Sequence, residues 1–343
     1  MCVSTNGLLR PRTGFGYTGV MPTKPAHGQA PTCDLSVVIV NYNSAHLLRP
    51  CFSALHEAAD CLSMETIVVD NGSTDGSLDM LRGELKPTRL INAGRNLGFS
   101  RANNLGARYA RGRYLLLLNT DCFLRPGSLR KLVNMLDAVP DVGAVGPRLL
   151  NSDGSLQPSC HNFPNPLVFF LEQSSLWKLL QRAPFLRDRI YIASSHGRTV
   201  AVDWLVGACM LLRAEAFAQV DGFYERFFFY WEETDLCMRL WQRGWKVLFE
   251  PSAQAVHLGG GSSGSSGSSG NPELRVEFFR SLYRFYRKHY PAYSLAIARA
   301  IVRLMALYKA ARSGIAILSP GLASDQKIAA IQDAKGWLAA ARL

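Results

Sequence analysis

The 343-residue sequence lacks any long apolar run that is free of charge. Its longest apolar stretch, residues 295–318, is interrupted by four basic side chains, whereas a membrane-spanning helix needs about 20 largely uncharged residues. The first thirty residues contain no apolar core long enough for a secretory signal. We therefore expect neither a membrane span nor export of the protein.

Paired or closely spaced cysteines are also missing. The eight cysteines are scattered along the chain and include no Cys-x-x-Cys motif. This pattern favours free thiols in a reducing compartment over a disulfide framework. We predict a cytoplasmic protein.

Acidic residues are in the minority. The chain has 38 Lys and Arg against 26 Asp and Glu, a formal net charge of +12. Such a balance favours anionic partners such as phosphates or acidic lipid. The basic residues gather in the C-terminal part without interleaved strand aromatics, so we predict no binding to nucleic acid.

Changes in composition divide the chain into four regions. Residues 1–33 are rich in Gly, Pro and Thr and are predicted to form a flexible leader. Residues 34–258 have the pattern of an α/β domain. Residues 259–271 are almost pure Gly and Ser, which is typical of a mobile loop or linker. Residues 272–343 are predicted to form a helical C-terminal region.

Short β-branched or Leu-rich runs alternate with helical segments after residue 34, which predicts an α/β fold with a mostly parallel central sheet flanked by helices. The predicted strands are 36–40, 66–69, 89–91, 114–118, 142–146 and 246–249. The predicted helices are 46–59, 76–85, 100–111, 128–138, 167–186 and 233–244.

Polar clusters follow three of these strands. They begin at Asn41, Asp70 and Asn119. Because parallel strands end at one edge of an open sheet, and ligands bind in the crevice outside that edge, the clusters are expected to converge on one site. Asp70 is placed to accept hydrogen bonds from a base or ribose, although Asn71 and Gly72 are also ordinary turn residues.

Two further features carry carboxylates. Asp121 emerges directly from a buried strand, and hard divalent cations prefer oxygen ligands of this kind. The alternative for Asp121 is an N-cap of the next segment. The run 231–235 places Glu232, Glu233 and Asp235 beside aromatic residues, which suits a general base of raised pKa. The alternative is an acidic first turn that is favoured by the helix dipole.

His257 lies beyond the strand predicted at 246–249 and directly before the Gly/Ser run. It is a candidate for a further metal or phosphate contact, with a structural histidine as the alternative. In the tail, residues 273–290 form a helical pattern with basic residues on one face and aromatic residues on the other. That helix fits either a membrane-surface anchor or packing onto the α/β domain.

Taken in order, these pieces resemble the inverting family 2 glycosyltransferases of the GT-A fold, in particular the bacterial rhamnosyltransferase-like branch. The resemblance runs from about residue 35 to 262. It rests on the segments 37–43, 68–75, 96–99, 118–121, 207–209, 231–237 and 256–257. It implies that residues 34–258 are a catalytic domain.

The resemblance also implies roles for individual residues. Glu233 would be the catalytic base, supported by Glu232 and Asp235, with the choice between Glu232 and Glu233 left open. Asp121 and His257 would bind Mg²⁺ or Mn²⁺. The nucleotide sugar would be bound by Asn41, Asn43, Asp70, Asn71, Arg95, Asn96, Gly98, Phe99, Asn103, Asn119, Gly207 and Ala208. The common Asp-x-Asp metal motif is reduced here to Asn119-Thr120-Asp121, with one carboxylate.

The expected function is transfer of a sugar, with L-rhamnose from dTDP-L-rhamnose as the branch-level expectation, onto a saccharide or polyprenyl-linked acceptor in cell-envelope polysaccharide synthesis. A UDP-hexose donor is an alternative, as is a non-catalytic membrane-associated scaffold. A sugar nucleotidyltransferase is disfavoured, since no Gly-rich, basic phosphate loop follows the first strand. The basic tail extends the cytoplasmic prediction to peripheral attachment at the inner face of the plasma membrane.

Overall fold

The computed structural model describes residues 31–164, 166, 196–259, 272–318 and 323–343. These residues form two compact units, each with a core of its own. Within the described residues the first unit holds 31–163, 196–226 and 232–258, and the second holds mainly 227–231, 272–318 and 323–343. The predicted helix 167–186, nearly all of the predicted leader and the Gly/Ser run 260–271 lie outside the described residues.

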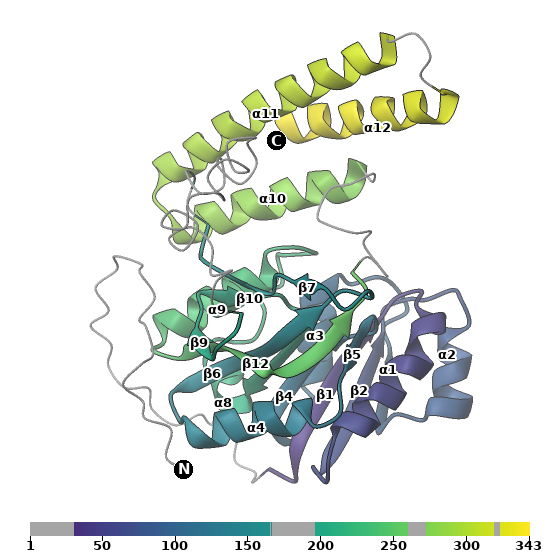
Figure 1. The fold of residues 1–343 in the computed structure, drawn as a ribbon, viewed down its shortest axis with the longest axis vertical. Helices are drawn as coiled ribbons and strands as arrows, with labels where there is room; N and C mark the ends of the chain where they lie inside the picture. The colour runs from purple at the N-terminus through teal and green to yellow at the C-terminus, as the bar shows by residue number, and fades with distance from the viewer. Residues whose placement is uncertain (1–30, 165, 167–195, 260–271, 319–322) are drawn as a thin grey trace. The chain divides into compact units, whose positions relative to one another are not determined.

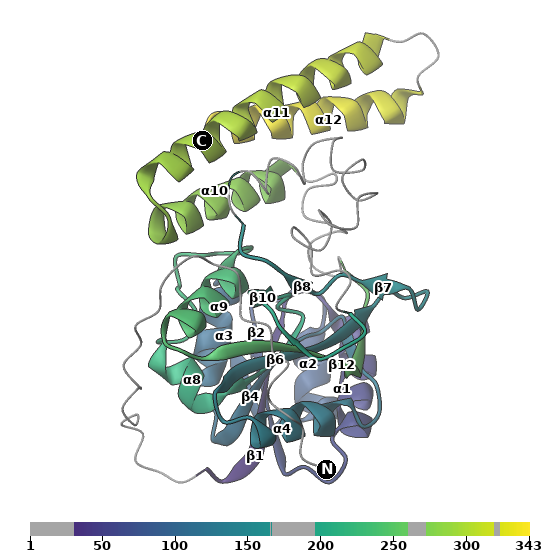
Figure 2. The same cartoon turned by 60° about the vertical axis from the view of Figure 1, so that its left-hand side comes forward.

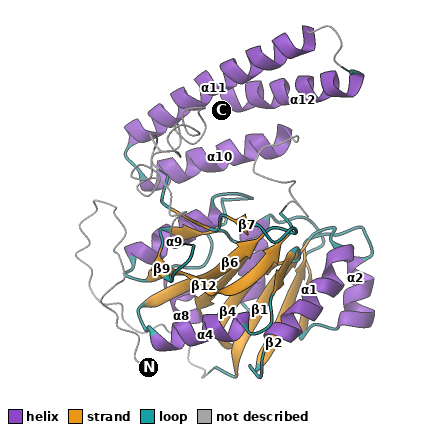
Figure 3. Cartoon of the chain, in the orientation of Figure 1, coloured by secondary structure: helices purple, strands orange, loops and turns teal. Residues whose placement is uncertain are grey.

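A mixed sheet forms the centre of the first unit (Figures 1 and 3). Its main strands run in the order β3-β2-β1-β4-β11-β6-β12-β5, with β7 beside β6 and β9 beside β12. Their bounds are β1 Cys33–Asn41, β2 Met64–Asp70, β3 Arg89–Asn92, β4 Gly112–Asn119, β5 Cys122–Leu124, β6 Val142–Leu150, β7 Leu156–Gln157, β9 Val200–Ala201, β11 Cys209–Arg213 and β12 Lys246–His257. Strands β8 (Cys160–His161) and β10 (Trp204–Leu205) form a separate two-stranded sheet.

The longest ladders of the main sheet are parallel. Strands β3, β2, β1 and β4 pair in parallel, as do β6 and β12. Strand β11 is antiparallel to both β4 and β6, and β5 is antiparallel to β12. The predicted α/β fold with a mostly parallel sheet is therefore confirmed.

Helices cover both faces of this sheet. Helices α1 (Ala45–Ala58) and α4 (Ser128–Ala138) share one core with the alternate β-strand residues Val37, Ile39 and Leu116. Helix α3 (Phe99–Ala107) lies on the other face, where a Cβ at Gly106 would come within 2.6 Å of Val38 Cγ1. The remaining helical segments are α2 Ser77–Met80, the π-helical turn η2 Leu81–Leu85, α8 Ala214–Gln219 and α9 Glu232–Gln242.

Strand β12 is much longer than the predicted strand 246–249. It continues through Pro251, where its ladder with β6 shifts register between Glu250 and Gln254, and it ends at His257. A proline at such an irregularity costs no ladder hydrogen bond. His257 is consequently part of a strand, and the short strand β5, which no sequence pattern indicated, pairs with its last residues.

The described residues of the second unit form three long helices: α10 (Pro272–His289), α11 (Ala292–Leu318) and α12 (Ser324–Ala341). Figure 2 shows α12 running back along α11. Helix α10 matches the helix predicted at 273–290. Its aromatic face is buried with residues of α11 and α12 in the core of this unit. The same aromatic face also packs against Trp231, and attachment of the helix to a membrane surface stays a prediction.

Among the residues that the structure describes, no helix combines the length and the apolar character that a membrane span requires. The seven cysteines in the same residues are all free, as predicted.

Candidate active site

Strand register brings the three predicted polar clusters to one edge of the sheet. Asn41 at the end of β1 pairs with Asp70 at the end of β2, and Asp70 pairs with Asn92 at the end of β3. On the other side of β1, Val40 pairs with Asn119, the last residue of β4. The carboxyl ends of four parallel strands thus form one continuous row.

Asp70 is fully buried and its carboxylate is used by the protein's own loops. Its two oxygens accept hydrogen bonds from Asn41 Nδ2 at 2.8 Å and from the Ser73 backbone N–H at 3.0 Å. The Ser73 hydroxyl also accepts a bond from the Asn43 backbone N–H at 3.0 Å. Asp70 and Asn41 therefore fix the shape of this edge, and a direct contact with a nucleotide stays a prediction.

Asn71 holds the predicted nucleotide loop. Its Oδ1 accepts a hydrogen bond from the Leu97 N–H at 2.8 Å, and its Nδ2 donates to Asn96 Oδ1 at 3.0 Å. Asn96 Oδ1 also accepts a bond from the Gly98 N–H at 2.9 Å. The Arg95 and Asn96 side chains are exposed, which leaves them able to meet a ligand.

Gly72 and Asn103 support the same loop from two sides. Gly72 has a φ of +85°, and a Cβ there would lie 2.7 Å from Arg95 Cα, so only glycine fits without displacing the loop backbone. Asn103 is buried and donates to the Phe99 carbonyl oxygen at 3.0 Å. The Phe99 ring packs edge-on against Phe223.

Asp121 and His257 are brought together although 136 positions separate them in the sequence. Asp121 immediately precedes β5, whose Cys122 pairs with His257 at the end of β12. The Leu258 N–H donates to the Asp121 carbonyl oxygen at 3.0 Å. The Asp121 Oδ1 atom lies 3.4 Å from His257 Nε2, and both residues have little exposed surface.

Gln157 determines which nitrogen of His257 carries the proton. Its amide nitrogen lies 3.3 Å from the His257 carbonyl oxygen, which can only accept, so the amide orientation is fixed. Gln157 Oε1 then faces His257 Nδ1 at 2.7 Å and must accept its proton. In the neutral ring Nε2 therefore presents a lone pair toward Asp121.

This arrangement fits a divalent cation. A lone pair and a carboxylate oxygen 3.4 Å apart repel each other unless a proton or a cation lies between them. Two ligands of one cation, each about 2.1 Å from it and at right angles, lie about 3 Å apart. A metal-binding histidine commonly donates its other N–H to an oxygen, as His257 does to Gln157.

The two residues do not complete a metal site by themselves. In the described part of the chain, no three His, Cys, Asp or Glu side chains gather in a way that could hold an ion. Mg²⁺ in particular is often held by one or two carboxylates together with substrate phosphates and water. The donor set formed by Asp121 and His257 is compatible with that mode of binding.

Glu233 lies in the first turn of α9, beside Gly207. Its carboxylate accepts a hydrogen bond from the Gly207 N–H, and a Cβ at Gly207 would lie 3.5 Å from Glu233 Cβ. Burial raises the pKa of Glu233, and the backbone hydrogen bonds lower it by less. Glu233 keeps partial exposure, whereas Glu232 is only 4% exposed.

Asp235 has a structural partner. Its Oδ2 atom lies 2.7 Å from Arg239 Nε, one helical turn further along, and the Asp235 side chain is fully buried. Arg239 also donates to the backbone carbonyl oxygens of Val220 and Gly222. This ion pair anchors α9 and thereby the position of Glu233.

A tight turn links the acidic helix to the sheet edge. The Ala208 carbonyl oxygen accepts a hydrogen bond from the Asn119 N–H at 2.9 Å, directly before strand β11. The preceding residue Gly207 contacts Glu233. Residues 207–208 therefore join Glu233 to the Asn119–Asp121 segment, so that the predicted acid cluster and the predicted metal ligands belong to one continuous part of the unit.

No sequence pattern indicated that Gln157 contacts His257. It lies in the two-residue strand β7, within a segment rich in Pro and Asn whose pattern is that of a loop. A single glutamine in a loop has no distinguishing signal. Its relation to His257 depends on the pairing of β7 with β6 and of β6 with β12.

The known proteins that this chain resembles are glycosyltransferases. Residues 36–217 match the family described as "Glycosyl transferase family 2". The chain is 32% identical over 238 residues to the "N-acetylglucosaminyl-diphospho-decaprenol L-rhamnosyltransferase" of Mycobacterium tuberculosis, covering 65% of this chain and 75% of that protein. It is 27% identical over 210 residues to the "Low-salt glycan biosynthesis hexosyltransferase Agl10" of Haloferax volcanii, covering 60% of this chain and 61% of that protein.

Among solved structures, the mannosyltransferase PcManGT from Pyrobaculum calidifontis, determined with GDP-Man and Mn²⁺, superimposes with a TM-score of 0.51 at 17% identity. The alignment covers 95% of this chain and 90% of that one. At this identity the likeness establishes the fold. The sequence match over more than half of the chain establishes the family: the protein is a glycosyltransferase that belongs to glycosyl transferase family 2.

Proposed function

We propose that the protein is an inverting, divalent-metal-dependent transferase that moves L-rhamnose from dTDP-L-rhamnose onto a lipid-linked saccharide. The observation that carries this proposal is the joining of Asp121, His257 and Glu233 at one sheet edge by the turn at residues 207–208. The choice of sugar and acceptor is supported by the name of the mycobacterial relative.

Glu233 is proposed to act as the base. A carboxylate of raised pKa takes a proton more readily than an ordinary one, and Glu233 Oε2 accepts no hydrogen bond from the described residues, which leaves it able to accept one from an acceptor hydroxyl. Glu233 accepts the hydroxyl proton while the acceptor oxygen forms a bond to the anomeric carbon. The bond from that carbon to the donor phosphate breaks on the opposite side, and the nucleoside diphosphate leaves with the electron pair.

Asp121 and His257 are proposed to hold Mg²⁺ or Mn²⁺ together with the donor diphosphate. A divalent ion there supplies positive charge that stabilises the leaving diphosphate. The chain's own contribution is to orient the two ligands: β5 fixes Asp121, and Gln157 fixes the ring of His257. Asn71 and Gly72 hold the loop at residues 95–99, which is proposed to close on the nucleotide.

A UDP-hexose donor is the second candidate, because the haloarchaeal relative is named a hexosyltransferase. A panel of donors separates the two: dTDP-rhamnose, UDP-glucose, UDP-galactose, UDP-N-acetylglucosamine and GDP-mannose, each with Mn²⁺ or with EDTA. We expect dTDP-rhamnose to be consumed with Mn²⁺ and not with EDTA. Consumption of a UDP-hexose instead would show that the donor is a UDP-hexose. Consumption of no donor would favour a scaffold without catalytic activity.

We further propose that the helical unit attaches the enzyme peripherally to the anionic inner face of the plasma membrane, from the cytoplasmic side. Residues 272–343 contain twelve Lys and Arg and four Asp and Glu, a net +8 out of the chain's +12. Helix α11 also exposes large apolar side chains spaced three, four or seven residues apart, which places them on one face. These are Tyr293, Ile297, Leu304, Leu307, Tyr308 and Ile315.

Co-sedimentation with vesicles tests this attachment. Ile297→Ser combined with Leu304→Ser removes apolar surface from the exposed face of α11 without touching its buried face. We expect this pair to weaken binding to vesicles containing phosphatidylglycerol, while Ile328→Ser on α12 serves as a single-site comparison. Unchanged binding by the α11 pair contradicts the attachment through α11, and a change of oligomeric state instead would assign that face to a second copy.

A further inference from the structure

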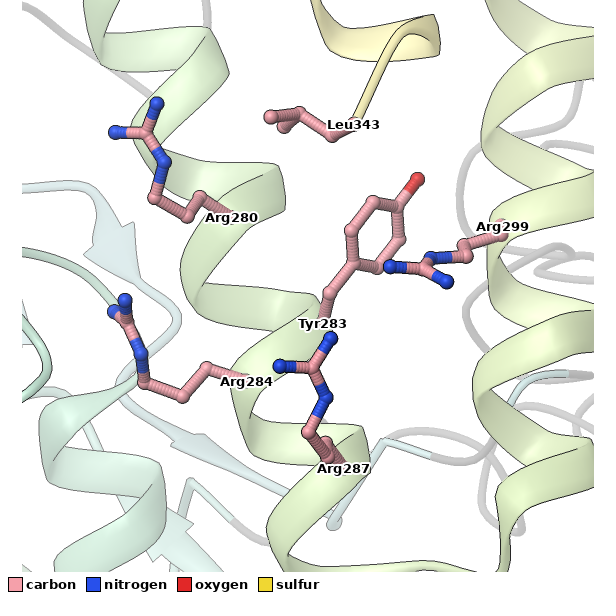
Figure 4. A pocket seen from close by; sticks show the side chains of 6 residues that line it. All are labelled: Arg280, Tyr283, Arg284, Arg287, Arg299 and Leu343. Atoms are coloured by element: carbon pink, nitrogen blue, oxygen red, sulfur yellow. The ribbon is translucent and has the colours of Figure 1, made fainter.

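The helical unit contains a pocket in which four of the six lining residues are arginines (Figure 4). Its volume is about 160 Å³. Arg280, Arg284 and Arg287 come from successive turns of α10, and Arg299 reaches from α11 toward the Tyr283 ring. Leu343 completes the wall. All of these residues belong to one compact unit.

Two of the four arginines in this pocket lack an ion-pair partner among the described residues. Arg280 pairs with Glu277 at 2.6 Å. Arg287 and Arg299 form no ion pair within the described part of the chain, and the Nε–H of Arg299 is buried there without a hydrogen-bond acceptor. Four guanidinium groups around one space repel one another, and an anion bound among them relieves that repulsion.

The chemistry of the lining selects the kind of anion. Guanidinium groups offer paired N–H donors that match the oxygens of phosphate in a bidentate arrangement. Burial raises the pKa of Tyr283 to about 12, so its hydroxyl stays protonated and can donate as well. A phosphate group presents several oxygens to such a set of donors, whereas a single carboxylate would leave most of them unused.

We infer that the pocket formed by Arg280, Arg284, Arg287 and Arg299 binds a phosphate or diphosphate group. Two sources share that chemistry: the headgroup of an anionic or diphosphate-bearing lipid, and free phosphate or pyrophosphate in solution. This inference does not depend on the transferase activity, because none of the four arginines is assigned to the donor site or to the base.

Calorimetric titration of the full chain with inorganic pyrophosphate tests the pocket directly. EDTA is kept in the buffer so that a metal-dependent donor site does not contribute. Arg287→Gln combined with Arg299→Gln is compared with Arg312→Gln combined with Lys335→Gln, which removes equal charge from exposed positions outside the pocket. We expect the pocket pair to weaken binding by about tenfold or more, and the control pair by about twofold at most.

A second pair of variants tests the hydrogen-bonding geometry of the arginines, and vesicle binding distinguishes the two sources of phosphate. Arg287→Lys combined with Arg299→Lys keeps the positive charge but removes the paired N–H donors of the guanidinium groups. We expect an intermediate loss of pyrophosphate affinity. If the source is a lipid, vesicles containing phosphatidic acid bind the wild type, and pyrophosphate competes with them. If the source is free phosphate, vesicle binding is the same in wild type and pocket variants. Equal pyrophosphate affinity in wild type and the Gln pair, or no binding of either probe, overturns the inference.

Discussion

His257 Nδ1 lies 2.7 Å from Gln157 Oε1, and Gln157 also donates to the backbone carbonyl oxygen of the same histidine. Gln157 therefore sets both the tautomer and the ring orientation of His257. We predict that Gln157→Leu lowers the affinity for Mn²⁺ by about 10- to 100-fold, as is typical when the partner of a metal-binding histidine is removed. Electron paramagnetic resonance of free Mn²⁺ in the presence of donor nucleotide measures this affinity.

Gln332→Leu is the matched control, because Gln332 is exposed on α12. It is expected to leave Mn²⁺ affinity unchanged. Gln157→Leu protein that folds normally and binds Mn²⁺ as tightly as the wild type would show that Gln157 does not position a metal ligand.

The pH dependence of transfer is expected to report Glu233. Because burial raises the pKa of this carboxyl group, the base is lost as pH falls through a value above the ordinary glutamate pKa of about 4.3. We predict that the acid limb of kcat/KM lies above that value. In Glu233→Gln the residual rate is expected to fall by about 10²- to 10⁴-fold and to lose this limb. An acid limb at the ordinary value, or one retained in the variant, argues for another base.

Substitutions of Gly72 and Gly76 can be compared to test the contact between Gly72 and the predicted nucleotide loop. Both have positive φ, +85° and +83°, but only at Gly72 would a Cβ collide with the backbone of Arg95. We predict that Gly76→Ala costs about 1–2 kcal/mol of unfolding free energy from backbone strain. Gly72→Ala should cost about 1–3 kcal/mol more and raise the KM for the donor. Urea denaturation and donor kinetics check both effects, and equal behaviour of the two variants contradicts the contact with Arg95.

The buried ion pair between Asp235 and Arg239 is expected to matter more for stability than an exposed one. Arg239→Met removes the arginine that forms the ion pair with the fully buried Asp235 carboxylate, and breaking a buried ion pair in this way typically costs about 3–5 kcal/mol. Arg49→Met breaks an exposed pair with Glu84 and should cost at most about 1 kcal/mol. Thermal and urea unfolding of the two variants measure the difference, and similar losses would show that the buried pair does not anchor α9.

Local patterns in the sequence were enough to predict strands β1, β2 and β4 and the sheet edge at which they end. The apolar runs that became β1, β2 and β4 are buried on both faces, so their strand character is visible without any partner. The polar residues that follow them meet because parallel strands share an edge, which is a property of the fold class. The pairing of Asn41 with Asp70 follows from that rule.

Features that depend on long-range pairing could not be predicted in this way. Strand β5 has three residues and takes its conformation from β12, and β12 crosses a proline that interrupts the sequence pattern of a strand. The sequence of helix α10 is amphipathic, but it does not indicate what covers the aromatic face. What buries it is the pair of helices α11 and α12, whose own apolar residues lie on more than one face.

The roles of Asp121 and Glu233 are tested most directly by comparing sugar transfer by wild type, Asp121→Ala and Glu233→Gln in one assay, with donor binding measured in parallel. We predict that both variants lose transfer. Glu233→Gln should still bind the donor with Mn²⁺, whereas Asp121→Ala should lose the metal-dependent part of donor affinity. Transfer at wild-type rates by either variant would contradict the assignment of the metal ligand and the base at this sheet edge.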